Sequence, residues 1–381
     1  MLRHRLQRGA SLKGAVRMIA ETYRFVLVLC LALPGLLMAV VPWITPAGEV
    51  FAVTVPGSAR HDPRIKRLRA GYAAAVIVLT AVVVAVGVAT SDNPVLYCVL
   101  VTLLPVVGFA AMLVCRSRVQ AIKVAEGWSA KGEKAVAAVL PEAAPKPLPV
   151  AWNLLYVPII LVTIAITVML YPSMPDQIPV HAGFDGTVNR WADKTNFLEI
   201  GFPVLMQVFM AAVMVGCHWG VLKSKSGRPS SRPVAGALAY GKFAQLETAV
   251  VLGVGLALTA SMGLIVLTYA GILSLNDAAI MIMVVTLVAA GIAVGVSFWC
   301  GQSGARLLSH ADESDHIDVD DDEWWKAGVF YWAPDDPSIF VPKRFGMGWT
   351  LNFGNWRSWA IMVAFLAVTV GIVVLAVVMS S

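Results

Sequence analysis

The strongest constraint on the fold is a series of eight apolar runs, each about as long as a helix that crosses a lipid bilayer. A spanning helix needs roughly 20 residues, because each adds about 1.5 Å across a hydrocarbon core about 30 Å thick. Of the 381 residues, 58% are hydrophobic and only 14% are charged, whereas soluble domains have about 25% charged residues. The sequence therefore predicts an all-α polytopic membrane protein in contact with the lipid bilayer. The runs are 25–43, 71–90, 94–115, 152–171, 199–222, 248–271, 278–300 and 359–379.

Lysine and arginine are concentrated in alternate loops, and cytoplasmic loops are the ones enriched in these residues. Loops 44–70, 116–151 and 223–247 carry them, whereas loops 91–93 and 272–277 carry none. This predicts that loop 172–198 is external and segment 301–358 is cytoplasmic. We interpret the net charge of +6 as an orientation signal, not as a nucleic-acid site.

The N-terminal residues conflict with this alternation. Positions 1–17 carry five basic residues on the side predicted to be external. Translation starting at Met18 would remove them. Alternatively, the first run, which contains Pro34 and Gly35, enters the membrane without spanning it.

Motifs of soluble enzymes and of metal or nucleotide sites are not found in the sequence. It lacks HExxH, GxxxxGK[ST] and a helix-opening GxGxxG, and its five cysteines form no CxxC pair. We therefore expect no enzymatic activity and no cofactor or metal. Few ionisable residues fall within the apolar runs, chiefly His218 near the end of one and Glu247 beside another, which disfavours a secondary transporter. For His218 we expect anchoring at the inner interface.

The external loop 172–198 has an ordered polar sequence. Its prolines exclude a continuing helix, the stretch 179–181 is expected to be extended, and Asp185-Gly186 is typical of a tight turn. The loop should therefore form a hairpin-like cap. His181 either meets a ligand or holds this turn, and Lys194 either pairs with an incoming charge or anchors the loop. The candidate functional residues are Pro175, Ile178, Pro179, His181, Asp185, Gly186, Asn189, Trp191 and Lys194.

A second informative segment, 324–357, precedes the last apolar run. Aromatic and β-branched residues at 329–332 and 349–353 predict short strands, and 334–337 and 345–348 provide turns. We expect a small β-rich cytoplasmic module. We interpret the preceding acidic stretch 310–323 as a solvated linker, since it lacks the glycine of a calcium loop. The candidate residues of the module are Trp325, Tyr331, Pro334, Pro337, Pro342, Lys343, Arg344, Gly346, Gly348, Trp349 and Asn352.

The order P-x-x-I-P-x-H-x-x-x-x-G-x-x-x-x-W-x-x-K, from Pro175 to Lys194, resembles the membrane domain of the SdpI-like family. These proteins give Gram-positive bacteria immunity to a sporulation-delaying peptide toxin. Segments 46–56 and 324–357 also resemble cytoplasmic elements of longer family members. The resemblance implies a multi-pass protein of the bacterial plasma membrane.

These observations give a predicted domain plan and three functional hypotheses. The plan divides the chain into an N-terminal membrane region 1–145, an SdpI-like domain 146–300, an acidic linker 301–323, a module 324–357 and a last helix 358–381. The favoured hypothesis is an immunity or envelope-stress protein whose external loop recognises or blocks a membrane-active peptide. The alternatives are a sensor that couples this loop to a cytoplasmic regulator, and a transporter or permease subunit.

Overall fold

The fold is a set of long apolar helices with a small β structure at each end. The computed structural model describes residues 25–26, 28–45, 48–90, 93–130, 145–183, 187–225, 233–308, 317 and 320–380. Seven helices in these residues are long and apolar enough to span a membrane, which confirms the predicted all-α polytopic class. They comprise α2 (Pro63–Ala89), α3 (Pro94–Ala125), α4 (Tyr156–Leu170) flanked by 3₁₀ turns η2 (Val150–Leu155) and η3 (Tyr171–Ser173), α5 (Phe197–Lys223), α6 (Pro233–Met262) continued by α7 (Leu264–Tyr269), α8 (Leu275–Cys300) and α9 (Trp356–Ser380).

The eighth predicted run differs from the other seven. Among the described residues it forms the helix Val28–Ile44, which at about 1.5 Å per residue is shorter than a straight crossing needs. The basic residues before Met18 lie outside the described residues, so the proposed later start stays a prediction.

Several helices extend further than the apolar runs predict. Helix α2 begins at Pro63, where the Asp62 side chain accepts a hydrogen bond of 2.7 Å from the Arg64 amide. Helices α3 and α6 likewise continue through Lys123 and Lys242. The prediction that segments 44–70, 116–151 and 223–247 are loops throughout is therefore partly wrong. Apolar character ends at the membrane surface, whereas helical hydrogen bonding continues beyond it.

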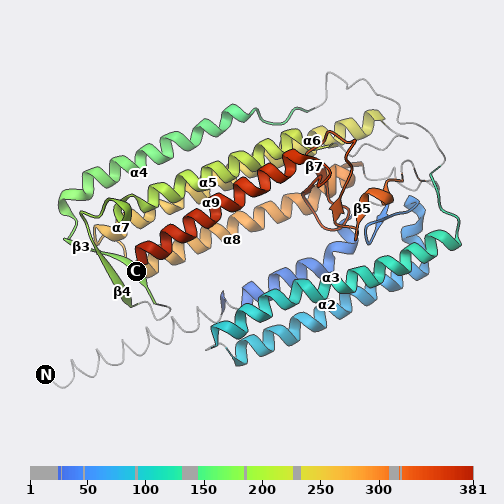
Figure 1. Cartoon of the computed structure of the whole chain (residues 1–381), viewed down its shortest axis with the longest axis horizontal. Coiled ribbons are helices and arrows are strands. Elements are labelled where there is room, and N and C mark those ends of the chain that lie inside the picture. Colours follow the sequence, from blue (N-terminus) through green and yellow to red (C-terminus); the bar gives the residue numbers. More distant parts are fainter. Residues whose placement is uncertain are drawn as a thin grey trace.

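The helices form two groups that lie on either side of the β structure at one end (Figure 1). Helices α2 and α3 pack together with Val28–Ile44, and helices α4 to α8 form the larger group. Within the larger group, the buried Gln207 amide donates hydrogen bonds of 2.9 Å to the Thr163 hydroxyl and the Thr259 carbonyl. These bonds join α5 to α4 and α6 close to Gly263, where α6 gives way to α7.

The predicted external loop forms a hairpin, as expected. Strands β3 (Gln177–Ala182) and β4 (Val188–Asp193) are antiparallel, with Ile178 opposite Ala192 and an irregular register near His181. Pro179 is tolerated because a two-stranded hairpin leaves edge positions without a required amide donor. The predicted turn residues Asp185 and Gly186 lie outside the described residues.

The module 324–357, predicted to be cytoplasmic, consists of two short hairpins, which confirms its β character. Strands β5 (Trp325–Lys326) and β6 (Phe330–Tyr331) form one hairpin, and β7 (Phe340–Pro342) and β8 (Trp349–Leu351) form the other. The fully buried Asn352 links them. Its amide donates to the carbonyls of Ala333, Asp336 and Ser338, and its oxygen accepts from the amides of Ala333 and Gly354.

A third small element lies beside the module. Strands β1 (Glu49–Val50) and β2 (Val53–Thr54) and the turn η1 (Gly57–His61) pack on α2 and α3. The Phe51 ring stacks on Phe345 of the module, with ring centres 5.9 Å apart. Sequence segments 48–62 and 320–353 thus meet at the same end of the helices.

The acidic stretch is not simply a solvated linker, and that prediction was wrong for its last part. Residues 309–316, 318 and 319 lie outside the described residues. Asp320 and Asp322, however, form ion pairs of 2.6 and 2.7 Å with Lys123 of α3. Asp321 forms an ion pair with the buried Arg344. These carboxylates are partly removed from solvent because they pair with cations from two other segments, Lys123 of α3 and Arg344 of the module.

Candidate functional site

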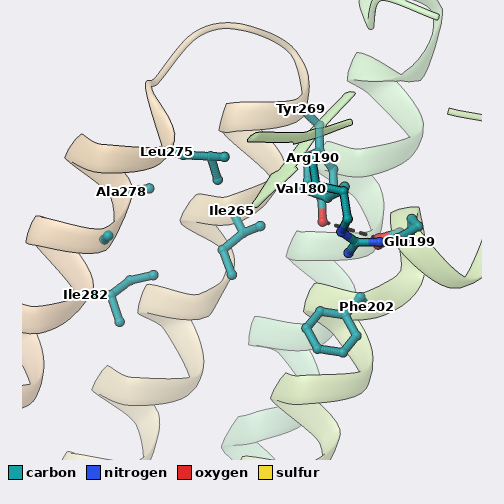
Figure 2. A pocket seen from close by; sticks show the side chains of 10 residues that line it. Val180, Arg190, Glu199, Phe202, Ile265, Tyr269, Leu275, Ala278 and Ile282 are labelled. Carbon is teal, nitrogen blue, oxygen red and sulfur yellow. Dashed lines mark hydrogen bonds and ion pairs between the residues drawn. The ribbon is translucent and has the colours of Figure 1, made fainter. Parts of the chain in front are cut away.

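A cavity of about 240 Å³ lies beneath the β3–β4 hairpin, at the end of the helices opposite the module (Figures 1 and 2). We call it the hairpin cavity, and we call its end of the molecule the external end, following the predicted orientation. Apolar side chains form most of its wall, and Figure 2 shows one charged pair at its side. Its lining residues are Val180, Arg190, Glu199, Phe202, Ile265, Tyr269, Leu275, Ala278, Ala279 and Ile282.

The charged pair consists of Arg190 from β4 and Glu199 from the first turn of α5. The guanidinium lies 2.7 Å from the carboxylate, and their side chains are 31% and 5% exposed, respectively. Asn196 caps α5 through a 3.1 Å hydrogen bond from the Leu198 amide, and this places Glu199 where the positive end of the helix dipole favours an anion. Ionised groups are costly to bury unless they are paired, so the hairpin and α5 are held together by this contact.

Tyr269 completes the polar side of the cavity. Its buried hydroxyl donates a 3.2 Å hydrogen bond to the Glu199 carbonyl. Its ring belongs to a small core with Met174, Ile178 and Val266. Helix α7, the base of the hairpin and the start of α5 therefore meet at one point, while α8 forms the opposite wall.

The loop residues singled out from sequence that the structure describes contribute to the hairpin and are not among the residues that line the hairpin cavity. The fully buried Ile178 anchors its base, whereas Trp191 is exposed and Pro175 and Pro179 bound and stiffen the chain. His181 Nδ1 lies 2.5 Å from Asn189 Oδ1 across the strands. This contact favours a shape-holding role for His181, with Asn189 as the partner.

Lys194 is an internal brace. Its ammonium donates a 3.0 Å hydrogen bond to the Met174 carbonyl and lies 3.1 Å from the Asp176 carboxylate. Of its two predicted roles, these contacts favour anchoring the loop.

Sequence reasoning missed Arg190, Glu199, Tyr269 and the α8 wall as site residues. One signal was available, since Glu199 is a carboxylate in the first turn of an apolar helix, where ionisable residues commonly mark functional sites. The α8 residues had no such signal, because Ala278 and Ile282 are indistinguishable in sequence from ordinary lipid-facing or packing residues.

Two other polar residues proved to be buried contacts between helices. His218, predicted to anchor at the interface, is fully buried and lies 3.0 Å from the Asn153 side chain and 2.9 Å from the Leu148 carbonyl. That prediction was wrong because the chain before α4 folds over the end of α5. Glu247 of α6 accepts a 2.9 Å hydrogen bond from Ser297 of α8.

The predicted module residues serve mainly to build the module and dock it on the helices. Trp325 and Tyr331 form its core. Lys225, just beyond α5, forms a 2.7 Å ion pair with Asp336. Although burial opposes the shift, hydrogen bonds from Lys225, Ser338 and Tyr331 lower the pKa of Asp336 to about 2.

The second hairpin of the module faces α6 and α8. Trp349 packs on Phe243 with ring centres 5.8 Å apart, and Gln302 exchanges two hydrogen bonds with the backbone of Gly348. Gly346 and Gly348 have φ angles of 92° and 94°, a conformation that glycine adopts without strain. Pro334 and Pro337 flank the turn between the two hairpins, and Pro342 ends β7 beside the exposed Lys343.

Chemically, the hairpin cavity combines a mostly apolar wall with the Arg190–Glu199 ion pair. Among the described residues, no group of three or more His, Cys, Asp or Glu side chains is placed to hold a metal ion. A ligand that suits the cavity has an apolar part for the wall and a polar group that can reach Arg190 or Glu199.

Comparison with protein families identifies two segments. A domain of unknown function, DUF1648, matches residues 159–206 and so covers most of α4, the hairpin and the start of α5. A family of unknown function, DUF5808, matches residues 334–359, the second half of the module. No curated protein and no solved structure matches the chain.

Proposed function

We propose that the hairpin cavity binds a membrane-active peptide at the outer face of the membrane, as expected of an SdpI-like immunity or envelope-stress protein. The Arg190–Glu199 pair in an otherwise apolar cavity carries this proposal. The DUF1648 match spans both residues of the pair, and this domain is consistent with the family that the loop sequence resembles.

The cavity chemistry defines the part of a peptide that would bind. An apolar side chain of the peptide would leave the lipid or water interface and fill the space between Phe202, Ile265 and Ile282. Arg190, which is the more exposed partner of the pair, would face a peptide carbonyl or terminal carboxylate. Ligand pockets commonly combine apolar walls with a few polar groups that fix orientation. We propose binding without a catalytic step or a cofactor.

A protection experiment with a cavity-filling variant tests this function. A deletion strain would be complemented with wild type, Ala279→Leu or Ala290→Leu and challenged with a panel of membrane-active peptides. Ala279 lines the cavity, whereas Ala290 is an exposed position farther along the same helix, so the two changes add the same atoms to α8.

We expect wild type and Ala290→Leu to protect and Ala279→Leu to lose protection at matched protein levels in the membrane. Equal protection by both variants would contradict a role for the hairpin cavity. Equal sensitivity of the deletion strain and its parent to every peptide would contradict immunity toward that panel.

A second candidate function is a membrane sensor, and α5 provides the observation that favours it. This single helix carries Glu199 in its first turn, and its opposite end leads into Lys225, which pairs with Asp336 of the module. Trp219 also packs edge-on against Phe340. A shift of α5 on ligand binding would therefore reach the module directly.

Peptide-dependent co-purification of a soluble regulator with the full chain would support the sensor hypothesis. Loss of this co-purification in Asp336→Asn would show that the Lys225–Asp336 contact transmits the signal. None of these contacts favours the transporter hypothesis.

A further inference from the structure

A cluster of charged side chains, buried or partly buried, joins four segments that are distant in sequence. Arg344 of the module forms ion pairs with Asp321 and Asp322, and its Nε lies 3.4 Å from the Glu49 carboxylate of β1. The Arg344 side chain is only 5% exposed. Lys123 of α3 pairs with Asp322 as well, at 2.7 Å. We call this set, with Asp320 and Arg116, the charged cluster.

The cluster also holds a strained turn. Phe51 and Ala52, the two residues between β1 and β2, have φ angles of 47° and 60°. Glycine or asparagine usually occupies such positions, and other residues keep this conformation only where their surroundings enforce it. Here the guanidinium groups of Arg116 and Arg344 donate to the Ala52 carbonyl, and Asp322 accepts from the Thr54 amide at 3.0 Å. The turn is therefore stabilised by contacts with other segments.

The module contacts both groups of helices. On one side it contacts the α4–α8 group through Asp336, Phe340 and Trp349. On the other side, Arg344 and Phe345 contact β1, β2 and α2. The module thus bridges the two groups of helices, as Figure 1 shows, and the charged cluster is one of its two attachments.

The balance of charge in the cluster depends on one proton. Four carboxylates, from Glu49 and Asp320 to Asp322, face three cations. Protonating one carboxylate makes the cluster neutral. Glu49 is the candidate because its Oε2 atom is buried and has no hydrogen-bond partner among the described residues.

The acidity of Glu49 agrees with this assignment. Burial, reinforced by the charge of Asp322, raises the pKa of Glu49 to about 7. The cations of Arg344, Lys123 and Arg116 oppose this shift without cancelling it. His61 is the histidine nearest to Glu49 in the sequence, and its Nε2 atom lies 3.3 Å from the Nε atom of Arg60.

We propose that the charged cluster is a proton-sensitive clasp, in which protonation of Glu49 tightens the attachment of the module to the N-terminal helices. An acid whose pKa is higher in the closed state than in the open state binds its proton more strongly when closed. Closing is therefore weakest above pH 7 and strengthens as the pH falls from about 7 toward the ordinary value of 4.5. The clasp would respond to cytoplasmic pH independently of any ligand at the hairpin cavity.

Amide hydrogen exchange on the full chain in lipid nanodiscs tests the clasp. After correction for intrinsic exchange rates, we expect protection of 48–56 and 320–345 to fall about tenfold between pH 6 and pH 8. Strand β4 at the external end should not change and serves as the internal reference. Equal protection of 48–56 at both pH values would overturn the proposal.

Two variants distinguish titration of Glu49 from a merely structural role. Glu49→Gln should keep high protection at both pH values, because the amide keeps an acceptor for Arg344 but cannot ionise. Lys123→Gln removes a cation that lowers the Glu49 pKa, so the midpoint of the pH dependence should move to higher pH. Lys326→Gln, an exposed module lysine, is the matched control and should behave as wild type. A tenfold change that survives in Glu49→Gln, or an unchanged midpoint in Lys123→Gln, would overturn the proposal.

Discussion

The two ends of the helices are built on opposite principles. At the external end, one hairpin covers a cavity, and an ion pair between Arg190 and Glu199 ties it to α5. At the end that carries the module, three hairpins and the ends of several helices are packed together by aromatic contacts, by the charged cluster and by Asn352. One end keeps space beside a charge, and the other fills its space.

This difference teaches where each end can be changed without unfolding the protein. Removing one partner of a densely connected cluster leaves several groups unsatisfied, whereas removing one partner of the Arg190–Glu199 pair, whose guanidinium is 31% exposed, leaves fewer. We therefore expect substitutions at the end that carries the module to act mainly on stability. Substitutions around the hairpin cavity should act mainly on ligand binding.

The largest expected effect is that of Arg344→Met. It leaves the carboxylates of Glu49, Asp321 and Asp322 without their shared cation, and breaking a buried ion pair in this way costs about 3–5 kcal/mol. The free energy of unfolding, measured by denaturant titration in nanodiscs, should fall by this amount. The neighbouring Lys343→Met is the control, since Lys343 is exposed. If the free energy of unfolding falls by a similar amount in both variants, the buried position of Arg344 is not the cause of its effect.

Asn352→Ala should have the next largest effect. It removes a fully buried side chain that hydrogen-bonds four residues of the module, and each unsatisfied buried group costs about 1–3 kcal/mol. We expect a loss of about 2–3 kcal/mol, measured in the same titration. Asn355→Ala, at a half-buried asparagine in the same turn that donates to the Pro337 carbonyl and accepts from the Arg357 amide, should cost less, about 1 kcal/mol. If the two variants are equally stable, Asn352 does not hold the module together.

Glu199→Gln should cost less, about 1–2 kcal/mol. The amide still accepts from Arg190, and the partly exposed guanidinium can be hydrated in place of its lost counter-ion. A double-mutant cycle with Arg190→Gln would measure the coupling directly. Glu126→Gln, which affects an exposed ion pair with Arg64, is the control with little expected effect. A coupling of zero would show that the pair does not tie the hairpin to α5.

The smallest effect is expected for His181→Ala, about 0.5 kcal/mol. The histidine is exposed, and within the part of the hairpin that the structure describes its side chain contacts Asn189, so its loss affects one solvent-accessible contact. Peptide protection should be retained by this variant. Loss of protection without loss of stability would instead show that His181 takes part in peptide binding and that the binding site extends beyond the hairpin cavity.

The helices and the hairpin could be predicted because their signals are local. Apolar length identifies α2 to α9, and the prolines before His181 identify an extended loop. The helix start at Asp62-Pro63 was also readable as an N-cap followed by proline, although the apolar runs alone missed it.

The hairpin cavity and the charged cluster could not be predicted because they depend on tertiary contacts. Arg344 and the Ala52 carbonyl are 292 positions apart, and nothing near either residue indicates the other. The acidic residues at 320–322 read as a solvated run until the cations of α3 and the module are placed beside them. Likewise, Ala279 becomes a site residue only when α8 faces the hairpin.

The most direct test of the central claim is an equilibrium titration of nanodisc-embedded protein with a fluorescently labelled peptide against which the protein protects cells. We expect saturable binding to wild type and Ala290→Leu and an affinity at least about tenfold lower for Ala279→Leu, since one filled cavity site removes more than about 1.4 kcal/mol of binding energy. Equal affinities of the two leucine variants would contradict the claim that the hairpin cavity is the binding site.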